Sequence, residues 1–272
     1  MATYTEHNVT ANGINIHYYR STPPGGAPPI VMIHGLTDNG LCWVRVADAL
    51  CDSFDIILPD TRGHGLSDKP ASGYTVEERA ADVAALIDAL GLERPALFGH
   101  SLGGQVANVI AALYPDKVRA LVLEDPAWFG DQPQENRVRQ ADEWCEGLRN
   151  NQRLGRAGLI EHCRQENPGW HEDELGPWAD AKLQMSENAL RQILLSMRPG
   201  WQDFLRQVRC PVLLVTGDVE RGIIITPELY REAAALNPLV REAHIPNAGH
   251  CIHRDQFEPY MRAVKAFLKQ VF

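Results

Sequence analysis

Short apolar runs that alternate with helical patterns are the feature that most constrains the fold of this chain. The runs cover residues 30–33, 54–58, 97–98, 118–123 and 212–215. Each is almost continuous in apolar residues, as in strands buried on both faces of a parallel sheet. Residues 75–90 have helical apolar spacing behind a Thr75/Glu78 capping pattern. This alternation predicts a doubly wound α/β domain.

The alternation stops between residues 126 and 204, where the sequence is helical in pattern and rich in charged and amide residues. We interpret 126–204 as a helical cap inserted into a core of residues 1–125 and 205–272. Helices packed on the flank of the sheet are the alternative. Five tryptophans fall in this segment: Trp128, Trp144, Trp170, Trp178 and Trp201. Of these, Trp128 is our first candidate for substrate contact, because it closely follows the strand 118–123.

Charge and composition exclude several kinds of partner. With a net charge of −9, nonspecific affinity for nucleic acid or an anionic membrane is not expected. No run approaches the roughly 18–20 apolar residues that span a bilayer, and residues 1–20 lack an apolar stretch of signal-peptide length. The six cysteines include no CxxC pair, which gives a zinc site little support. We expect a cytoplasmic monomer or homodimer that acts on a small molecule without cofactor or metal.

The pentapeptide 99–103, Gly-His-Ser-Leu-Gly, is the strongest chemical motif. A GxSxG pattern is weak by itself, but here an apolar strand precedes it and a helical pattern follows it. This strand–turn–helix context is that of a nucleophile elbow, in which a strained turn exposes the serine hydroxyl. The motif predicts Ser101 as a nucleophile. An ordinary glycine turn with a capping serine is the alternative.

Two backbone N–H groups are candidates for an oxyanion hole. Leu36 follows His34-Gly35 directly after the strand 30–33, and Leu102 follows Ser101. Loops at the carboxyl ends of neighbouring strands meet in a doubly wound sheet, so these donors can converge on one carbonyl oxygen. We expect the His34 side chain itself to serve packing and hydrogen bonding in the loop.

The block 60–67, DTRGHGLS, has charges that look catalytic at first sight. We favour a structural role, in which Asp60 and Arg62 pair and fix the shape of the loop.

The best candidate for a general base is His250, in the stretch Asn-Ala-Gly-His at 247–250. It lies on a loop between a short strand at 242–245 and the last helical pattern, a position suited to base chemistry. His253, one turn further on, is the competing histidine.

Taken together, these motifs resemble the α/β-hydrolase superfamily, in its esterase-like branch with a helical cap. The resemblance rests on His34-Gly35, the block 60–67, GHSLGG at 99–104 and Gly249-His250. It implies an eight-stranded, mostly parallel sheet and a triad in the chain order serine, acid, histidine. An aspartate in place of the serine would have indicated the related epoxide hydrolases or haloalkane dehalogenases.

The acid of such a triad remains open among several residues. The family usually places it in a GxxD stretch after the strand that matches 212–215, and this spacing selects Glu220. Asp218 has the commoner residue type but comes two residues early. Some relatives take the acid from the end of the preceding core strand, where Glu124 and Asp125 stand.

The sequence therefore predicts a serine hydrolase that cleaves a small apolar ester-like substrate through an acyl-enzyme. A lactonase, a carbon–carbon bond hydrolase or a perhydrolase would use the same scaffold. A ligand receptor that keeps a hydrolase-like pocket is the non-enzymatic alternative.

Overall fold

The computed structural model describes residues 4–21, 23 and 26–272, and in this part of the chain eight strands form one sheet. The spatial order is β1-β2-β4-β3-β5-β6-β7-β8. The strands are β1 (Thr5–Ala11), β2 (Ile14–Ser21), β3 (Pro29–Ile33), β4 (Asp55–Pro59), β5 (Ala96–His100), β6 (Ala120–Glu124), β7 (Val212–Thr216) and β8 (Val240–His244). β2 pairs antiparallel with β1 and β4, and every pair from β4 to β8 is parallel. The mostly parallel sheet is confirmed.

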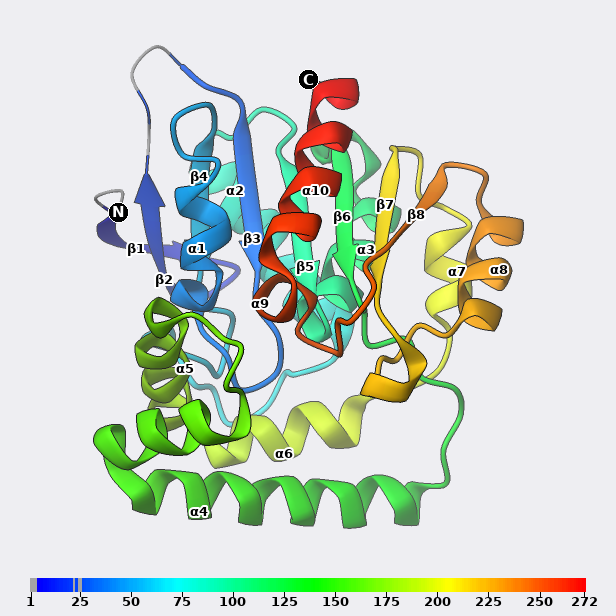
Figure 1. Cartoon of the computed structure of the whole chain (residues 1–272). Coiled ribbons are helices and arrows are strands. Elements are labelled where there is room, and N and C mark those ends of the chain that lie inside the picture. Colours follow the sequence, from blue (N-terminus) through cyan, green and yellow to red (C-terminus); the bar gives the residue numbers. More distant parts are fainter. Residues whose placement is uncertain (1–3, 22, 24–25) are drawn as a thin grey trace.

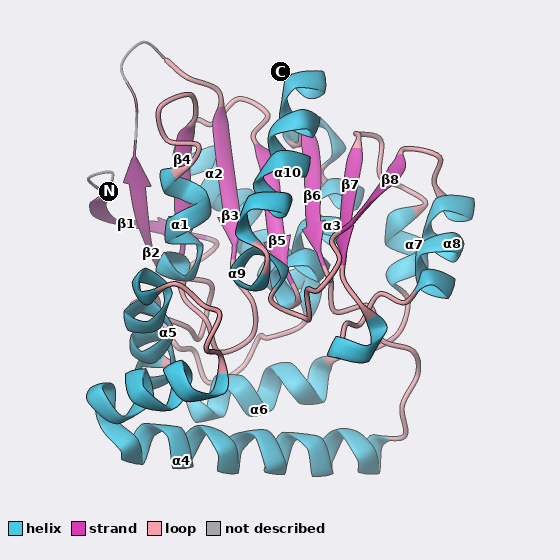
Figure 2. Cartoon of the chain, viewed as in Figure 1, coloured by secondary structure: helices cyan, strands magenta, loops and turns pink. Residues whose placement is uncertain are grey.

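Helices cover both faces of this sheet and lie across one of its ends (Figure 1, Figure 2). They are α1 (Val44–Asp48), α2 (Val76–Ala89), α3 (Leu102–Leu113), α4 (Gln134–Glu166), α5 (Glu172–Gln184), α6 (Glu187–Ser196), α7 (Trp201–Leu205), α8 (Pro227–Leu236), α9 (Ile252–Asp255) and α10 (Phe257–Val271), with short 3-10 turns at Gly40–Trp43, Pro115–Lys117 and Val219–Arg221. None of the helices in the described residues is long and apolar enough to cross a membrane.

Two apolar cores follow from the two-residue period of the strands. In β3, Val31 and Ile33 point to the core under α2 and α3, whereas Ile30 and Met32 point to the core under α1 and α10. Alternate residues point to opposite faces, and both faces are buried, so residues pointing to either face are apolar. The strands are therefore continuous apolar runs in the sequence.

Two local features of the sequence, an Asn-Gly turn and a capping box, define the turn between β1 and β2 and the start of α2. Asn12 and Gly13 both have positive φ, 49° and 78°, in the turn between β1 and β2, the conformation favoured in two-residue hairpins. Thr75 and Glu78 form the predicted capping box at the start of α2. The proline- and glycine-rich composition of residues 21–29 predicts a loop. Residues 22, 24 and 25 of this stretch lie outside the described residues.

The segment between β6 and β7 is helical, and α4, α5 and α6 lie across the end of the sheet toward which the parallel strands run (Figure 1). The long helix α4 is interrupted at Gly155, where φ is 63°. At the end of the segment α7 returns to the sheet: the Asn108 side chain of α3 donates to the carbonyl of Trp201 at 3.3 Å, and Leu205 is buried in the core under α3.

The expected pairing of Asp60 with Arg62 is wrong, although both residues do shape the loop. Asp60 accepts hydrogen bonds from the His17 ring at 2.9 Å, Gly40 N at 2.8 Å and Leu66 N at 2.9 Å. Arg62 turns the other way and forms an ion pair with Asp82 of α2. The two side chains leave opposite sides of the turn, so nearby charges of opposite sign have different partners.

A buried cluster of charges joins α5 to the loops at the end of the sheet. Lys182 of α5 contacts Asp38 at 3.1 Å and donates to the Thr37 carbonyl at 2.9 Å. Arg254 of α9 contacts Asp38 at 3.4 Å and Glu174 of α5 at 3.4 Å. Burial by itself raises the pKa of Asp38, but the positive charges of Arg254 and Lys182 hold it well below its usual range.

Replacement of Asp38 by asparagine should therefore destabilise the fold strongly. Asp38→Asn leaves Lys182 buried without the carboxylate that it contacts and leaves Arg254 with Glu174 alone. A loss of about 3–5 kcal/mol in the free energy of unfolding is expected, measured by urea denaturation. Asp142→Asn is the matched control, because Asp142 pairs with Arg191 on the surface; equal losses in the two variants would contradict the argument.

Candidate active site

Ser101 occupies a strained turn between β5 and α3. Its φ of 51° and ψ of −114° are disfavoured for a residue with a side chain and occur where surrounding structure enforces them. The neighbouring turn supplies this constraint: Ser101 N donates to the Glu124 carbonyl at 2.9 Å, and Ala127 N donates to the Ser101 carbonyl at 2.9 Å. The predicted strand–turn–helix context of Ser101 is therefore present.

Glycines around Ser101 are required by close backbone approach. A Cβ at Gly99 would lie 2.4 Å from the Gly103 carbonyl oxygen, and a Cβ at Gly103 would lie 2.1 Å from the Ile33 carbonyl oxygen. Both distances are far below contact distance. The GxSxG spacing thus lets α3 start directly against β5 and the end of β3.

Ser101 and His250 line one cavity of about 250 Å3, together with Leu36 and Leu102. Leu102 is the first residue of α3, so its N–H has no acceptor within the helix and the helix N-terminus favours negative charge there. Leu36 belongs to the loop after β3. The four residues that the sequence singled out for nucleophile, base and oxyanion donors are therefore brought to one cavity.

The carboxylate that holds His250 is Asp125. The Nδ1 atom of His250 lies 2.6 Å from Oδ2 of Asp125. Asp125 is fully buried and also accepts from the backbone N–H groups of Ile224 and Ile225 at 2.8–2.9 Å. On the other side of the ring, His100 lies against His250 with ring centroids 4.7 Å apart, and its Nε2 donates to the His250 carbonyl at 3.0 Å.

The environment of His250 favours its protonated form. Burial alone lowers the pKa of the imidazole, but the hydrogen bond and the negative charge of Asp125 outweigh it and raise the pKa above its ordinary value. The side chain of His250 is still 35% exposed, so the ring can exchange protons at the cavity. An imidazole poised in this way can accept and return a proton near neutral pH.

The expectation that Glu220 or Asp218 supports the histidine is corrected by this geometry. Glu220 lies in the 3-10 turn Val219–Arg221 and is exposed to solvent. Asp218 is 3.2 Å from the ring of His244 and accepts from Asn247 N at 2.8 Å. The loop after β7 contacts Asp125 through backbone N–H donors and supplies no carboxylate to His250. Spacing along that loop therefore selected the wrong residue, Glu220, as the acid.

Glu124, a candidate acid, and His253, the competing histidine, pair with each other. Both carboxylate oxygens of Glu124 lie 2.8 Å from Nδ1 of His253. Burial raises the pKa of Glu124, but the His253 ring and its backbone N–H outweigh this and lower the pKa to about 2. His253 is stacked on Trp43 with centroids 4.5 Å apart and is only 2% exposed, so it is sealed in the core beside the site.

The structure also places His34 and Trp128. The His34 ring is buried and accepts from Thr61 N at 3.0 Å, in line with the expected packing role. Trp128 as a substrate contact is wrong, because it is 1% exposed and stacks on Trp201 at 4.4 Å. These two large rings fill the core below α3 and do not line the cavity.

Eight further described residues line the cavity, and none of them belongs to a catalytic motif of the sequence. They are mostly apolar and come from the segment after β6, from α4, from the end of α6 and from the loop after β7: Ala127, Phe129, Gln140, Trp144, Leu194, Met197, Gly222 and Ile224. Among them Trp144 carried a signal, since it belongs to the tryptophan-rich segment. The others could be found only from the packing of α4 and α6.

Thiol and metal chemistry have little support in the described residues. Cys251 is adjacent to His250, but burial raises the pKa of its thiol to about 12 despite the opposing charge of Arg254, so it is protonated at neutral pH. No group of three or more His, Cys, Asp or Glu side chains in the described part of the chain is arranged to hold a metal ion.

Titration of His250 tests this geometry directly. Its imidazole should titrate with a midpoint above 6.5, followed by NMR of the ring nitrogens. In Asp125→Asn the burial remains while the attraction of the carboxylate is lost, so the midpoint should fall below that value. Glu220→Gln should leave it unchanged; a midpoint that follows Glu220 and not Asp125 would contradict the assigned pairing.

Comparisons with known proteins identify the family of the chain. The family model described as alpha/beta hydrolase fold matches residues 28–162. N-formylmaleamate deformylase from Pseudomonas putida is 31% identical over 96% of this chain and 95% of its own length. 2-(Acetamidomethylene)succinate hydrolase from Mesorhizobium japonicum is 27% identical over 90% of this chain and 89% of its own length. A solved thermophilic esterase from Thermogutta terrifontis is 27% identical, covers 99% of both chains and has a TM-score of 0.76.

The similarity to the deformylase extends over nearly the whole of both chains, and the eight-stranded, mostly parallel sheet and the Ser101 turn are those that the resemblance implied. The chain therefore belongs to the α/β-hydrolase family, and it is a hydrolase of the esterase-like kind.

Proposed function

We propose that the chain cleaves small, neutral ester-like substrates by two-step acyl transfer, with Ser101 as nucleophile, His250 as base and Asp125 as the acid of the triad. The observation that carries this proposal is the shared cavity of Ser101 and His250, in which Asp125 holds the imidazole from behind. The helices α4 and α6 act as a cap over this cavity, because Gln140, Trp144 and Leu194 contribute to its lining.

The reaction begins when Ser101 Oγ attacks the carbonyl carbon and its proton passes to Nε2 of His250. The Leu36 and Leu102 N–H groups hold the negative charge that appears on the carbonyl oxygen. Collapse of the adduct breaks the carbon–oxygen bond, and His250 returns the proton to the leaving oxygen. Water, deprotonated by His250, then releases the acyl group from Ser101. Asp125 keeps Nδ1 protonated and stabilises the imidazolium at each transfer.

The lining of the cavity favours a neutral and compact substrate. Its walls are largely aliphatic and aromatic, and no lysine or arginine stands among the described residues that line it. Its volume of about 250 Å3 is at the small end for ligand pockets, which hold roughly 300–1,000 Å3. The names of the two curated relatives refer to maleamate and succinate, which are acids. An acidic substrate would find no fixed cation among the described residues that line this cavity.

Removal of the Ser101 hydroxyl tests the nucleophile. Ser101→Ala should lower turnover of p-nitrophenyl acetate by more than about 10³-fold, because triad residues act as a unit, while circular dichroism stays unchanged. A fluorophosphonate should label Ser101 in the unmodified protein. Ser53→Ala, in an exposed turn, is the control; labelling of another serine, or activity retained without Ser101, would refute the role.

Charge removal at each candidate acid tests the triad. Asp125→Asn should lower turnover by about 10⁴-fold, as when a triad aspartate is lost. Glu220→Gln and Asp218→Asn should stay within a few-fold of the unmodified protein. Since His250 works unprotonated, kcat/KM should rise with pH and inflect above 6.5, because Asp125 raises the pKa of His250. A severe loss in Glu220→Gln with a mild loss in Asp125→Asn would overturn the assignment.

The setting proposed for this reaction is the cytoplasm. All six cysteines are free thiols, which fits a reducing compartment.

A further inference from the structure

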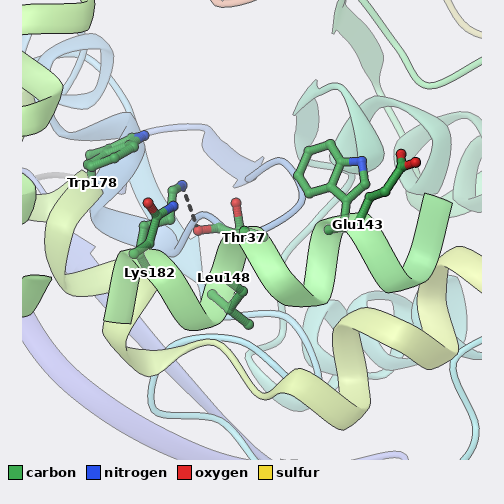
Figure 3. A pocket seen from close by; sticks show the side chains of 8 residues that line it. Thr37, Glu143, Leu148, Trp178 and Lys182 are labelled. Atoms are coloured by element: carbon green, nitrogen blue, oxygen red, sulfur yellow. Dashed lines mark hydrogen bonds between the residues drawn. The ribbon is translucent and has the colours of Figure 1, made fainter. Parts of the chain in front are cut away.

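A second cavity of about 470 Å3 lies between α4 and α5, beside the cavity of Ser101. Figure 3 shows its lining, with Trp178 and Lys182 of α5, Leu148 and Glu143 of α4, and the hydrogen bond from Lys182 to Thr37. None of its lining residues takes part in the proposed acyl transfer. We call it the α4–α5 groove.

The groove adjoins the cavity of Ser101 through shared and neighbouring residues. Trp144 lines both cavities. On α4, Gln140 lines the cavity of Ser101 and Leu148 lines the groove, so three residues spaced four apart follow one face of the helix. Leu36 lines the first cavity, and the next residue, Thr37, lines the groove. The two spaces therefore adjoin along α4, and Trp144 lines both.

The side chains of the groove suit a flat, neutral group. Trp144 is 44% exposed, although a large ring is normally buried when it only packs a core. Trp178 is half-buried and offers a second indole. Lys182 is already bound to the Thr37 carbonyl and Asp38, and Trp178 lies over its ammonium at 4.7 Å. Glu143, which is exposed, lies 4.0 Å from Arg139 and adds no positive charge to the groove. Aromatic surfaces without an uncommitted cation among the described lining residues favour an uncharged ring.

The position of the groove decides which part of a substrate it can hold. The leaving oxygen must receive a proton from His250, so the leaving group lies near His250, Gly222 and Ile224. The groove instead begins beside Leu36, at the oxyanion donors, and its described lining includes no residue of the His250 loop. Extension of the substrate along α4 therefore starts from the acyl side of the scissile bond.

We propose that the α4–α5 groove is an acyl subsite for a neutral aromatic ring carried a few bonds from the carbonyl, with Trp144 as the specificity-determining residue. This inference rests on the proposed acyl transfer at Ser101. It extends the substrate class from compact esters to arylalkanoic esters, whose chain passes Trp144 and whose ring lies in the groove that Trp144 and Trp178 line.

The experiment compares three p-nitrophenyl esters that share one leaving group and differ in the acyl part: acetate, 4-phenylbutyrate and hydrogen adipate. The unmodified protein should have its highest kcat/KM on 4-phenylbutyrate and its lowest on the acidic adipate. Trp178→Ala removes a ring that lines the groove but not the cavity of Ser101; it should lower kcat/KM for 4-phenylbutyrate about tenfold, the size of one aromatic contact, and change that for acetate less than about threefold. Trp144→Ala should lower kcat/KM for 4-phenylbutyrate about tenfold more than that for acetate.

Leu154→Ala is the matched control, because Leu154 is an exposed apolar residue of α4 that lines neither cavity. It should change none of the three rates. Equal losses on acetate and 4-phenylbutyrate in Trp144→Ala, or a preference for the adipate, would overturn the subsite while leaving the acyl transfer intact. Failure to hydrolyse even the acetate would instead count against the proposed function.

A binding measurement keeps the subsite testable in that event. The uncharged probe 4-phenylbutan-1-ol should bind the Ser101→Ala protein by calorimetry, and addition of Trp144→Ala should weaken binding about tenfold. Equal affinity with and without Trp144 would refute the subsite whatever the activity.

Discussion

Two strained turns that hydrogen-bond to each other hold the site together. Ser101 and Asp125 both have positive φ, 51° and 38°, which costs energy for residues other than glycine. Each lies directly after a parallel strand, and β5 and β6 are paired so that His100 stands opposite Glu124. Ser101 N bonds to the Glu124 carbonyl. The register of one strand pair therefore places residues 101 and 125 at neighbouring strand ends, before any loop contributes.

His250 comes from a distant part of the chain and is held beside Asp125, in the cavity that Ser101 lines. His250 comes 125 residues after Asp125 in the chain, on a loop that follows β8 at the edge of the sheet. Two contacts hold it, Asp125 at its Nδ1 and His100 at its carbonyl. The helix α9, which follows it in the chain, is anchored through Arg254 and Asp38. Asp38 is also bound by Lys182 of α5. One buried carboxylate thus couples the histidine loop, the Leu36 loop and the helical segment.

Features that a short motif marks can be predicted from the sequence, whereas those that depend on strand register cannot. The Ser101 turn could be predicted because close backbone contacts require the glycines at 99 and 103, which mark it in the sequence. The place of His250 in the cavity could be predicted because it stands in a short motif between a strand and a helix. The acid could not be fixed by counting along the loop after β7, since that loop offers backbone N–H groups to Asp125 instead. A usable signal existed: the ends of parallel strands align, so the residue after β6 faces the residue after β5.

The tryptophans also show the difference between what the sequence predicts and what only the packing determines. Nothing in the sequence separates Trp128, which fills the core, from Trp144, which borders the site; only the packing of α3, α4 and α7 does so. Composition indicated that rings would gather in the inserted segment. It could not assign them, because a large ring that is buried and one that lines a cavity have the same residue type and similar neighbours along the chain.

The adjacent residues Glu124 and Asp125 show how burial decides which of two histidines can take part in proton transfer. Glu124 and Asp125 each hold a histidine, and the histidines, His253 and His250, are themselves three residues apart. The two pairs have the same chemistry and nearly the same carboxylate–imidazole distance. His253, however, is stacked under Trp43 with 2% of its side chain exposed, whereas His250 keeps 35%. Proton transfer needs a path to a substrate, so the pair that opens into the cavity can do chemistry, and its sealed neighbour stabilises the loop that carries it.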